Sequence, residues 1–148
     1  MEQRNNNGMN ALNELVATII EECHKVHDEL GTELYPAVYR QILFQRLLKR
    51  GLFVQRGIPV SLPEEEQEIA VDLKAEFIVE NSVICEIKSV ERLLPAHKKE
   101  LATYLRLWNK PVGLLINFRA PQIKNGIIKQ ANNEYKNFLD RTGLDNNN

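Results

Sequence analysis

The stretch that decides the fold is Val83-Ile84-Cys85-Glu86-Ile87-Lys88, whose branched apolar residues predict a β-strand. Side chains two residues apart on a strand share a face, so Glu86 and Lys88 lie side by side while Cys85 and Ile87 point the other way. A carboxylate and an ammonium inside an apolar strand are costly to bury unless they are paired or bind a metal. Two interpretations follow: a half-exposed strand with a structural Glu–Lys pair, or a functional site.

The segment before this strand predicts its antiparallel neighbour. Residues 69–79 are rich in Val, Ile and Phe, and Glu80-Asn81-Ser82 separates them from the next strand with hairpin spacing. An odd-length loop centred on Asn81 sets Glu76 opposite Glu86, because opposed residues of an antiparallel pair share a face. A two-residue turn would set Glu76 opposite Ile87 instead. We predict the first register, which brings Glu76, Glu86 and Lys88 to the same side.

The remaining elements follow from helical periodicity and from apolar runs. Helices are predicted at 13–30, 36–50 and 95–108, an extended segment at 52–62, an acidic turn at 64–68, and a buried strand at 112–118. We expect the remainder, 119–142, to close with a short helix near 134–139. The strand at 112–118 follows a helical crossover, so it should run parallel to the strand at 83–90. This order predicts a mixed sheet flanked by helices, in the α/β class.

Length and composition fit one globular domain. The chain has 148 residues, of which 43% are hydrophobic and 26% charged. We expect one domain at 13–142 between disordered, Asn-rich tails at 1–12 and 143–148. The formal net charge of −1 excludes strong, indiscriminate attraction to nucleic acid, so a polyanion site needs a local basic patch. The cluster Arg92, Lys98, Lys99 and Arg106 is one candidate for phosphate binding, and a solvated helix face explains it equally well.

Several locations and site types are disfavoured by the sequence. No apolar run approaches the ~18–20 residues that cross a bilayer, and residues 1–10 lack the apolar core of a signal peptide. Cys23 and Cys85 are too few and too far apart for a disulfide framework or a CxxC metal site. We therefore expect a cytoplasmic protein with no membrane partner. The sequence does not indicate an oligomeric state.

The predicted hairpin and the third helix together form an oxygen-rich site. Glu76 and Glu86 converge beside Lys88, and paired carboxylates suit a hard cation such as Mg²⁺. Glu100 and Tyr104 lie four residues apart on one face of the helix, with His97 one turn before Glu100. Like charges raise one another's pKa, so we expect at least one of these glutamates to have a raised pKa in the metal-free protein.

The ordered set of segments resembles the PD-(D/E)xK nuclease superfamily and, within it, the small GxxExxY proteins. The resemblance covers about residues 13–125, and it rests on segments 20–31, 77–80, 86–91, 93–97, 103–105 and 113–118. It implies a restriction-endonuclease-like αβββαβ core with an extra N-terminal helix. The Glu-x-Lys of residues 86–88 matches the superfamily pattern fully.

The chain departs from the family pattern at several positions. The motif that names the GxxExxY proteins falls on Glu33, Pro36 and Tyr39, and only the tyrosine is kept. The usual strand aspartate is Glu76, which is one methylene longer and still able to reach a cation, and the usual helix glutamine is Glu100.

The resemblance also implies roles for the site residues. Glu76 and Glu86 would hold Mg²⁺ with the main-chain carbonyl of Ile87, and Lys88 would orient or activate water or stabilise charge at the phosphate. Substrate-contacting or supporting positions are Glu100, Tyr104, His97 and Tyr39.

Two functions remain open at this point. The first is Mg²⁺-dependent hydrolysis of phosphodiester bonds in DNA or RNA. The alternative is a catalytically degenerate nuclease fold that acts as a binding or assembly module. The intact Glu-x-Lys favours the first, whereas Pro36 and the two exchanged positions, Glu76 and Glu100, favour the second.

Overall fold

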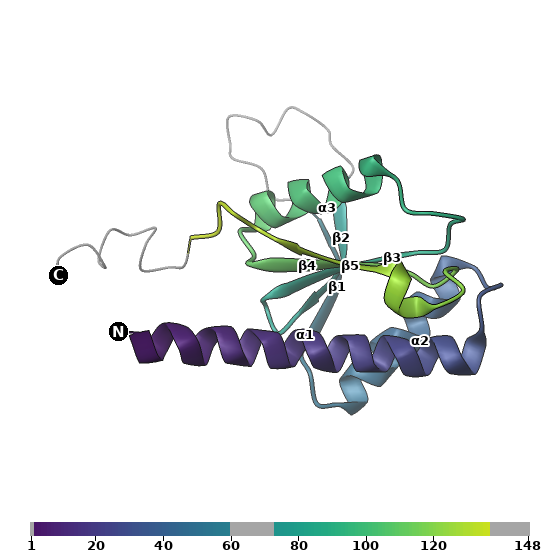
Figure 1. The fold of residues 1–148 in the computed structure, drawn as a ribbon, viewed down its shortest axis with the longest axis horizontal. Coiled ribbons are helices and arrows are strands. Elements are labelled where there is room, and N and C mark those ends of the chain that lie inside the picture. Colours follow the sequence, from purple (N-terminus) through teal and green to yellow (C-terminus); the bar gives the residue numbers. More distant parts are fainter. Residues whose placement is uncertain (1, 60–72, 137–148) are drawn as a thin grey trace.

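The computed structural model describes residues 2–59 and 73–136 (Figure 1). Its elements in chain order are α1 (Glu2–Leu30), α2 (Pro36–Lys49), β1 (Val54–Pro59), β2 (Lys74–Val79), β3 (Val83–Lys88), α3 (Pro95–Trp108), β4 (Val112–Asn117), the 3-10 helix η2 (Ile123–Gly126) and β5 (Ile127–Ala131). The expected order of helix, helix, three strands, helix and strand is confirmed. The prediction of the turn at 64–68 lies outside the described residues, as does that of the tail at 143–148.

The sheet is mixed, with the strand order β1-β2-β3-β4-β5. The pairs β1–β2 and β2–β3 are antiparallel, and β3 pairs with β4 in parallel, as the helical crossover predicts. Strand β5, which the sequence did not predict, adds an antiparallel edge beside β4. This strand is only partly buried and shows no strict alternation, so its sequence carries little strand signal.

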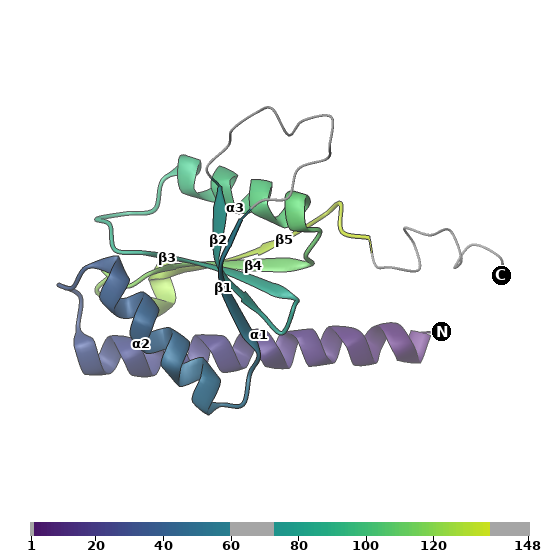
Figure 2. The same cartoon turned by 180° about the vertical axis from the view of Figure 1, so that it is seen from behind.

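Helices cover both faces of the sheet, with α1 and α2 on one face and α3 on the other (Figures 1 and 2). The larger core lies under α1 and α2 and includes Phe77, Cys85 and Leu114. The smaller core lies under α3 and includes Ile84 and Leu115. Every residue of β4 is buried, because this strand lies inside the sheet and is covered on both faces.

Helix α1 is longer than its sequence indicates. It begins at Glu2, whereas we predicted a disordered tail up to residue 12 and an N-cap at Asn13. The Asn13 side chain does not cap the helix, since its Oδ1 accepts a hydrogen bond from Lys129 Nζ at 3.4 Å. Leu12 packs against the larger core, and no proline interrupts the preceding residues. The helix therefore continues towards the N-terminus.

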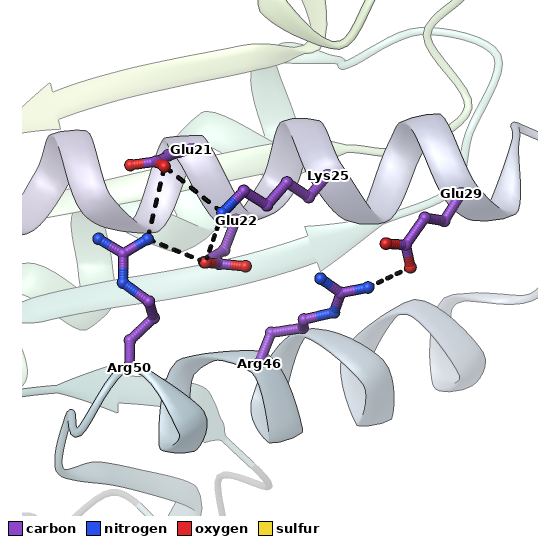
Figure 3. Close-up of polar contacts among 6 residues, drawn as sticks. All are labelled: Glu21, Glu22, Lys25, Glu29, Arg46 and Arg50. Carbon is purple, nitrogen blue, oxygen red and sulfur yellow. Dashed lines mark hydrogen bonds and ion pairs between the residues drawn. The ribbon is translucent and has the colours of Figure 1, made fainter.

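Ion pairs join α1 to α2, as Figure 3 shows. Glu22 is only 3% exposed, and its Oε1 lies 3.0 Å from Arg50 Nη1 and 3.4 Å from Lys25 Nζ. Arg46 hydrogen-bonds to Glu29 further along the same two helices. Arg46 of α2 and Arg50, which caps the end of α2, thus both face carboxylates of α1.

The hairpin between β2 and β3 has the predicted odd-length loop. Val79 pairs with Val83, which leaves Glu80, Asn81 and Ser82 in the loop. Glu80 and Asn81 both have positive φ, and Ser82 N–H donates to Val79 O at 2.9 Å. This is the geometry of a tight turn that matches the twist of the strands.

Among the described helices, none combines the length and apolar character that crossing a bilayer requires.

Candidate functional site

Glu76 and Glu86 lie opposite each other where the ladder between β2 and β3 ends. The last paired residues are Phe77 and Cys85, so Glu76 and Glu86 occupy the next position in the same register. Here side chains replace main-chain partners. Glu76 N–H donates to Glu86 Oε1 at 3.2 Å, and Ile87 N–H donates to Glu76 Oε2. Each carboxylate is therefore fixed by the backbone of the opposite strand.

The strands are irregular at this position. The β1 residue that faces Glu76 is Gly57, whose φ of +62° places it in the left-handed region that favours glycine. Phe77 belongs to the larger core while Ala75 belongs to the smaller one, although residues two apart on a regular strand share a face. The chain thus changes its orientation at Glu76. This change lets the carboxylate interact with α2 as well as with β3.

Burial and repulsion act together on Glu86. The residue is 2% exposed, and its pKa is raised to about 8, first by burial and then by the negative charge of Glu76. Burial also raises the pKa of Glu76, while the Ile87 N–H and the Arg40 charge oppose this rise. The prediction of a raised glutamate pKa is confirmed. Its main cause is loss of solvation, which the pattern of charges alone does not reveal.

Helix α3 adds two polar side chains to the same site. Lys88 Nζ lies 3.5 Å from Glu100 Oε1, which ties the lysine of β3 to the helix. The pKa of Tyr104 is raised to about 12, mainly by burial and then by the charges of Glu100 and Glu86. Glu76, Glu86, Lys88, Glu100 and Tyr104 are thus close enough to influence one another, as the sequence predicts.

His97 and Tyr39 have structural contacts of their own. His97 Nδ1 accepts the N–H of Leu94 at 2.9 Å, which caps the start of α3. Tyr39 is fully buried, its hydroxyl donates to Gly31 O at 2.6 Å, and its ring stacks on Phe118 with centroids 4.6 Å apart. In the described residues these contacts fix the ends of helices. They do not bring either side chain against the two glutamates.

Arg40 is a site residue that the sequence analysis missed. Its Nε lies 3.3 Å from Glu76 Oε1 and is buried without a hydrogen bond of good geometry in the described structure. Arg40 follows Pro36 by four residues and so shares its face of α2. The family pattern places a glutamate of the site at position 36. The four-residue spacing from that position is the sequence signal that could have identified Arg40.

Asn117 is a second missed residue, and it acts on the end of β3. Its Nδ2 donates to Val90 O at 2.9 Å, and its Oδ1 accepts the Val90 N–H at 3.0 Å. Phe118 N–H also donates to Lys88 O at 3.0 Å. These bonds tie the chain after β3 to the end of β4, and they fix the backbone that carries Lys88. Asn117 is a buried polar residue at a strand end, which was the available signal.

The donor set fits a hard divalent cation with few protein ligands. Within the described residues, no group of three or more His, Cys, Asp or Glu side chains is placed to hold a metal ion. Glu76 and Glu86 supply two carboxylates. Ile87, whose carbonyl is the third predicted ligand, lies between Glu86 and Lys88 in the sequence. Mg²⁺ commonly uses one or two carboxylates and fills its other positions with water or phosphate oxygens. Burial and the charge of Glu76 raise the pKa of Glu86 to about 8, although the nearby Lys88 charge lowers it.

Comparison with known proteins agrees with this arrangement. A family model described as the PD-(D/E)XK nuclease superfamily matches residues 13–130, which span most of α1 and nearly all of the sheet. No curated protein and no solved structure gives a match to this chain. The matched range includes both glutamates, Lys88 and the helix that carries Glu100. The chain therefore belongs to the PD-(D/E)XK nuclease superfamily.

Proposed function

We propose that this protein is a divalent-cation-dependent nuclease that hydrolyses phosphodiester bonds of DNA or RNA. The observation that supports this function best is the convergence of Glu76 and Glu86 at the end of β2 and β3, beside Lys88. A nuclease-like role follows from the superfamily, whereas catalysis is the finer step proposed here. We also propose the GxxExxY subfamily and a cytoplasmic location, the first on Tyr39 and its neighbouring segments.

In this mechanism Glu76, Glu86 and the Ile87 carbonyl would hold Mg²⁺. When bound, Mg²⁺ supplies positive charge that offsets the negative charge developing on the scissile phosphate. The Glu76 and Ile87 N–H groups keep the two carboxylates in place before the substrate arrives. Because these bonds are already made in the free protein, little reorganisation accompanies substrate binding.

Lys88 supplies the second positive charge of the proposed site. Its ammonium donates a hydrogen bond to the attacking water or to a phosphate oxygen, which orients the water and stabilises charge at the phosphate. Glu100 of α3 restrains this side chain, because its Oε1 lies 3.5 Å from Lys88 Nζ. We assign Glu100 as a positioning residue, because it acts through Lys88.

A cation titration tests the proposal directly. Mg²⁺ and Mn²⁺ are added separately to the protein with labelled single- and double-stranded DNA and RNA. We expect cleavage of at least one of these substrates that depends on the cation and stops with EDTA. Lys124→Ala serves as a control, because Lys124 is an exposed lysine of η2 outside the site. Absence of cleavage with either cation on all four substrates contradicts the enzyme.

The alternative function is a binding or assembly module with the same fold. It is favoured by the ion pair between Arg40 and Glu76, because the protein itself supplies a cation where a nuclease would need a metal. Calorimetric titration of Mg²⁺ separates the two functions. Nucleic-acid binding without heat of Mg²⁺ binding supports the module, and Mg²⁺ binding that disappears in Glu86→Gln supports the nuclease.

A further inference from the structure

A basic cavity opens beside Glu76, between α2, the edge strand β1 and its neighbour β2. Its volume is about 630 Å³, and its lining includes Gly57 and the polar side chains of Arg40, Gln41, Arg56, Lys74 and Glu76. Three of these residues carry positive charge and one carries negative charge. The cavity is therefore a local basic site in a chain whose formal net charge is −1.

Arg56 is held in place by neighbours that leave its charge unpaired. Its guanidinium carbon lies 4.0 Å from the centroid of the Phe44 ring, and Nη1 donates to Gln41 Oε1 at 2.9 Å. Among the described residues, no carboxylate forms an ion pair with Arg56. A stacked guanidinium with unused N–H donors is well suited to phosphate, because its planar fork binds two oxygens at once.

Arg40 connects this cavity to the proposed catalytic carboxylates. The same side chain lines the cavity and pairs through Nε with Glu76. Gly57 faces Glu76 from β1, and a Cβ added at Gly57 would meet no atom within 4 Å. The space next to Glu76 is thus open towards the basic side chains of the cavity. A phosphate bound there would lie next to the proposed catalytic carboxylates.

We propose that this cavity binds the sugar-phosphate backbone of a nucleic acid. The strand to be cut passes between α2 and the β1–β2 edge, and Arg56 and Lys74 contact its phosphates next to the scissile one. The path of the strand towards the scissile phosphate rests on the proposed nuclease function. The binding of a nucleic-acid backbone in the cavity does not depend on catalysis. The basic cluster of α3 is the weaker candidate, because Arg106 is already paired with Glu134 at 2.9 Å.

Binding in EDTA tests the cavity without any contribution from cleavage. The affinity for labelled single- and double-stranded DNA and RNA is measured by fluorescence anisotropy over a range of salt concentrations. Arg56→Ala/Lys74→Ala is compared with Lys98→Ala/Lys99→Ala, which removes the same charge from exposed positions on α3. We expect the affinity of the first variant to fall roughly tenfold. The dependence of its log affinity on log salt concentration should weaken by an amount equal to about two phosphate contacts. The affinity of the second variant should change little.

The controls address folding and the source of the phosphate. Arg56→Lys keeps the charge and should recover part of the affinity, and circular dichroism melting confirms that each variant is folded. A mononucleotide that competes as well as the oligonucleotide, at equal molar concentration, assigns the cavity to free nucleotides and overturns the proposal. A larger loss in Lys98→Ala/Lys99→Ala also overturns it, as does a wild-type protein that binds no nucleic acid.

The two proposals fail in different ways. Cation-dependent cleavage combined with unchanged binding by Arg56→Ala/Lys74→Ala contradicts the cavity and leaves the nuclease intact. Cavity-dependent binding without cleavage contradicts the nuclease and leaves a nucleic-acid-binding module.

Discussion

Two glutamates in this protein are buried to nearly the same degree and have opposite surroundings. Glu22 of α1 is 3% exposed and has Arg50 and Lys25 within 3.4 Å. Glu86 of β3 is 2% exposed, and within the described residues it forms no ion pair. It accepts the N–H of Glu76 instead, and it faces a second carboxylate.

We interpret this difference as one between a structural charge, at Glu22, and a charge of the proposed functional site, at Glu86. Burying a carboxylate removes its hydration, and nearby cations and hydrogen bonds must replace that hydration if the group is to stay ionised. The ion pairs between α1 and α2 do this for Glu22 (Figure 3). At Glu86 the compensation is incomplete, so its pKa is raised to about 8. Two buried carboxylates that face each other, one of them without an ion pair in the described residues, are typical of a site that receives its cation from solution.

The largest expected effect is on catalysis. Glu86→Gln and Lys88→Ala should each lower cation-dependent cleavage by at least ~100-fold, because each removes one charged group of the site. Glu22→Gln should leave the cleavage rate of the folded protein unchanged. Single-turnover rates at saturating Mg²⁺ provide the measurement. Equal losses in Glu86→Gln and Glu22→Gln would contradict the division between the two glutamates.

Stability should show the reverse order. Glu22→Gln removes a charged hydrogen-bond acceptor from Arg50, and we expect the free energy of unfolding to fall by about 2 kcal/mol. Glu86→Gln should cost much less, because a pKa of about 8 leaves Glu86 largely protonated at pH 7, so a neutral amide replaces a mostly neutral carboxyl group. Urea denaturation of both variants at pH 7 without metal gives the comparison. A destabilised Glu86→Gln protein with an inactive wild type would make Glu86 a structural residue.

The pH dependence of stability should distinguish the two regions further. The folded pKa of Glu86 is raised from 4.5 to about 8, so its stabilising contribution is complete below pH 4.5 and is lost as the pH rises through about 8. We expect the metal-free protein to melt at lower temperature over this rise. Glu86→Gln should flatten that dependence, whereas Glu22→Gln should retain it. A flat wild-type profile would contradict the raised pKa.

The smallest expected effect concerns Arg40. Arg40→Gln removes the cation paired with Glu76, so Mg²⁺ should bind about two- to fivefold more tightly in the absence of nucleic acid, as expected for the loss of a half-exposed ion pair. Isothermal titration calorimetry measures this change, with Arg46→Gln as a matched control on the same helix. Weaker Mg²⁺ binding in Arg40→Gln would show that Arg40 supports the site instead of competing for it.

Local patterns in the sequence predicted most of the fold. Alternation and loop length located Glu76 opposite Glu86, because a hairpin register depends on residues close in sequence. The proline at the start and the periodicity of α3 gave its bounds at Pro95 and Trp108 correctly. The family pattern then indicated which charged residues of these elements belong to the site.

The errors arose where distant packing decides the outcome. The partner of Arg40 depends on how α2 lies against β2, and no spacing within either segment encodes that contact. Tyr39 was predicted as a substrate-contacting or supporting residue through its motif, and this role stays a prediction. The contact of its hydroxyl with Gly31 O, just after α1, was likewise not encoded by local spacing. The edge strand β5 has a weak sequence signal, and it forms because β4 offers an unpaired edge.

The hydrogen bonds that hold the two carboxylates have a spectroscopic consequence. The amide protons of Glu76 and Ile87 are bonded to side-chain oxygens, whereas the neighbouring ladder amides are bonded to carbonyls. Carbonyl oxygens do not titrate near neutral pH, whereas the Glu86 carboxyl group, whose pKa is raised to about 8, does. The two amide resonances should therefore shift with the protonation of Glu86 and again when a cation binds. Their chemical shifts and hydrogen-exchange rates report the state of the site directly, in a protein that need not turn over any substrate.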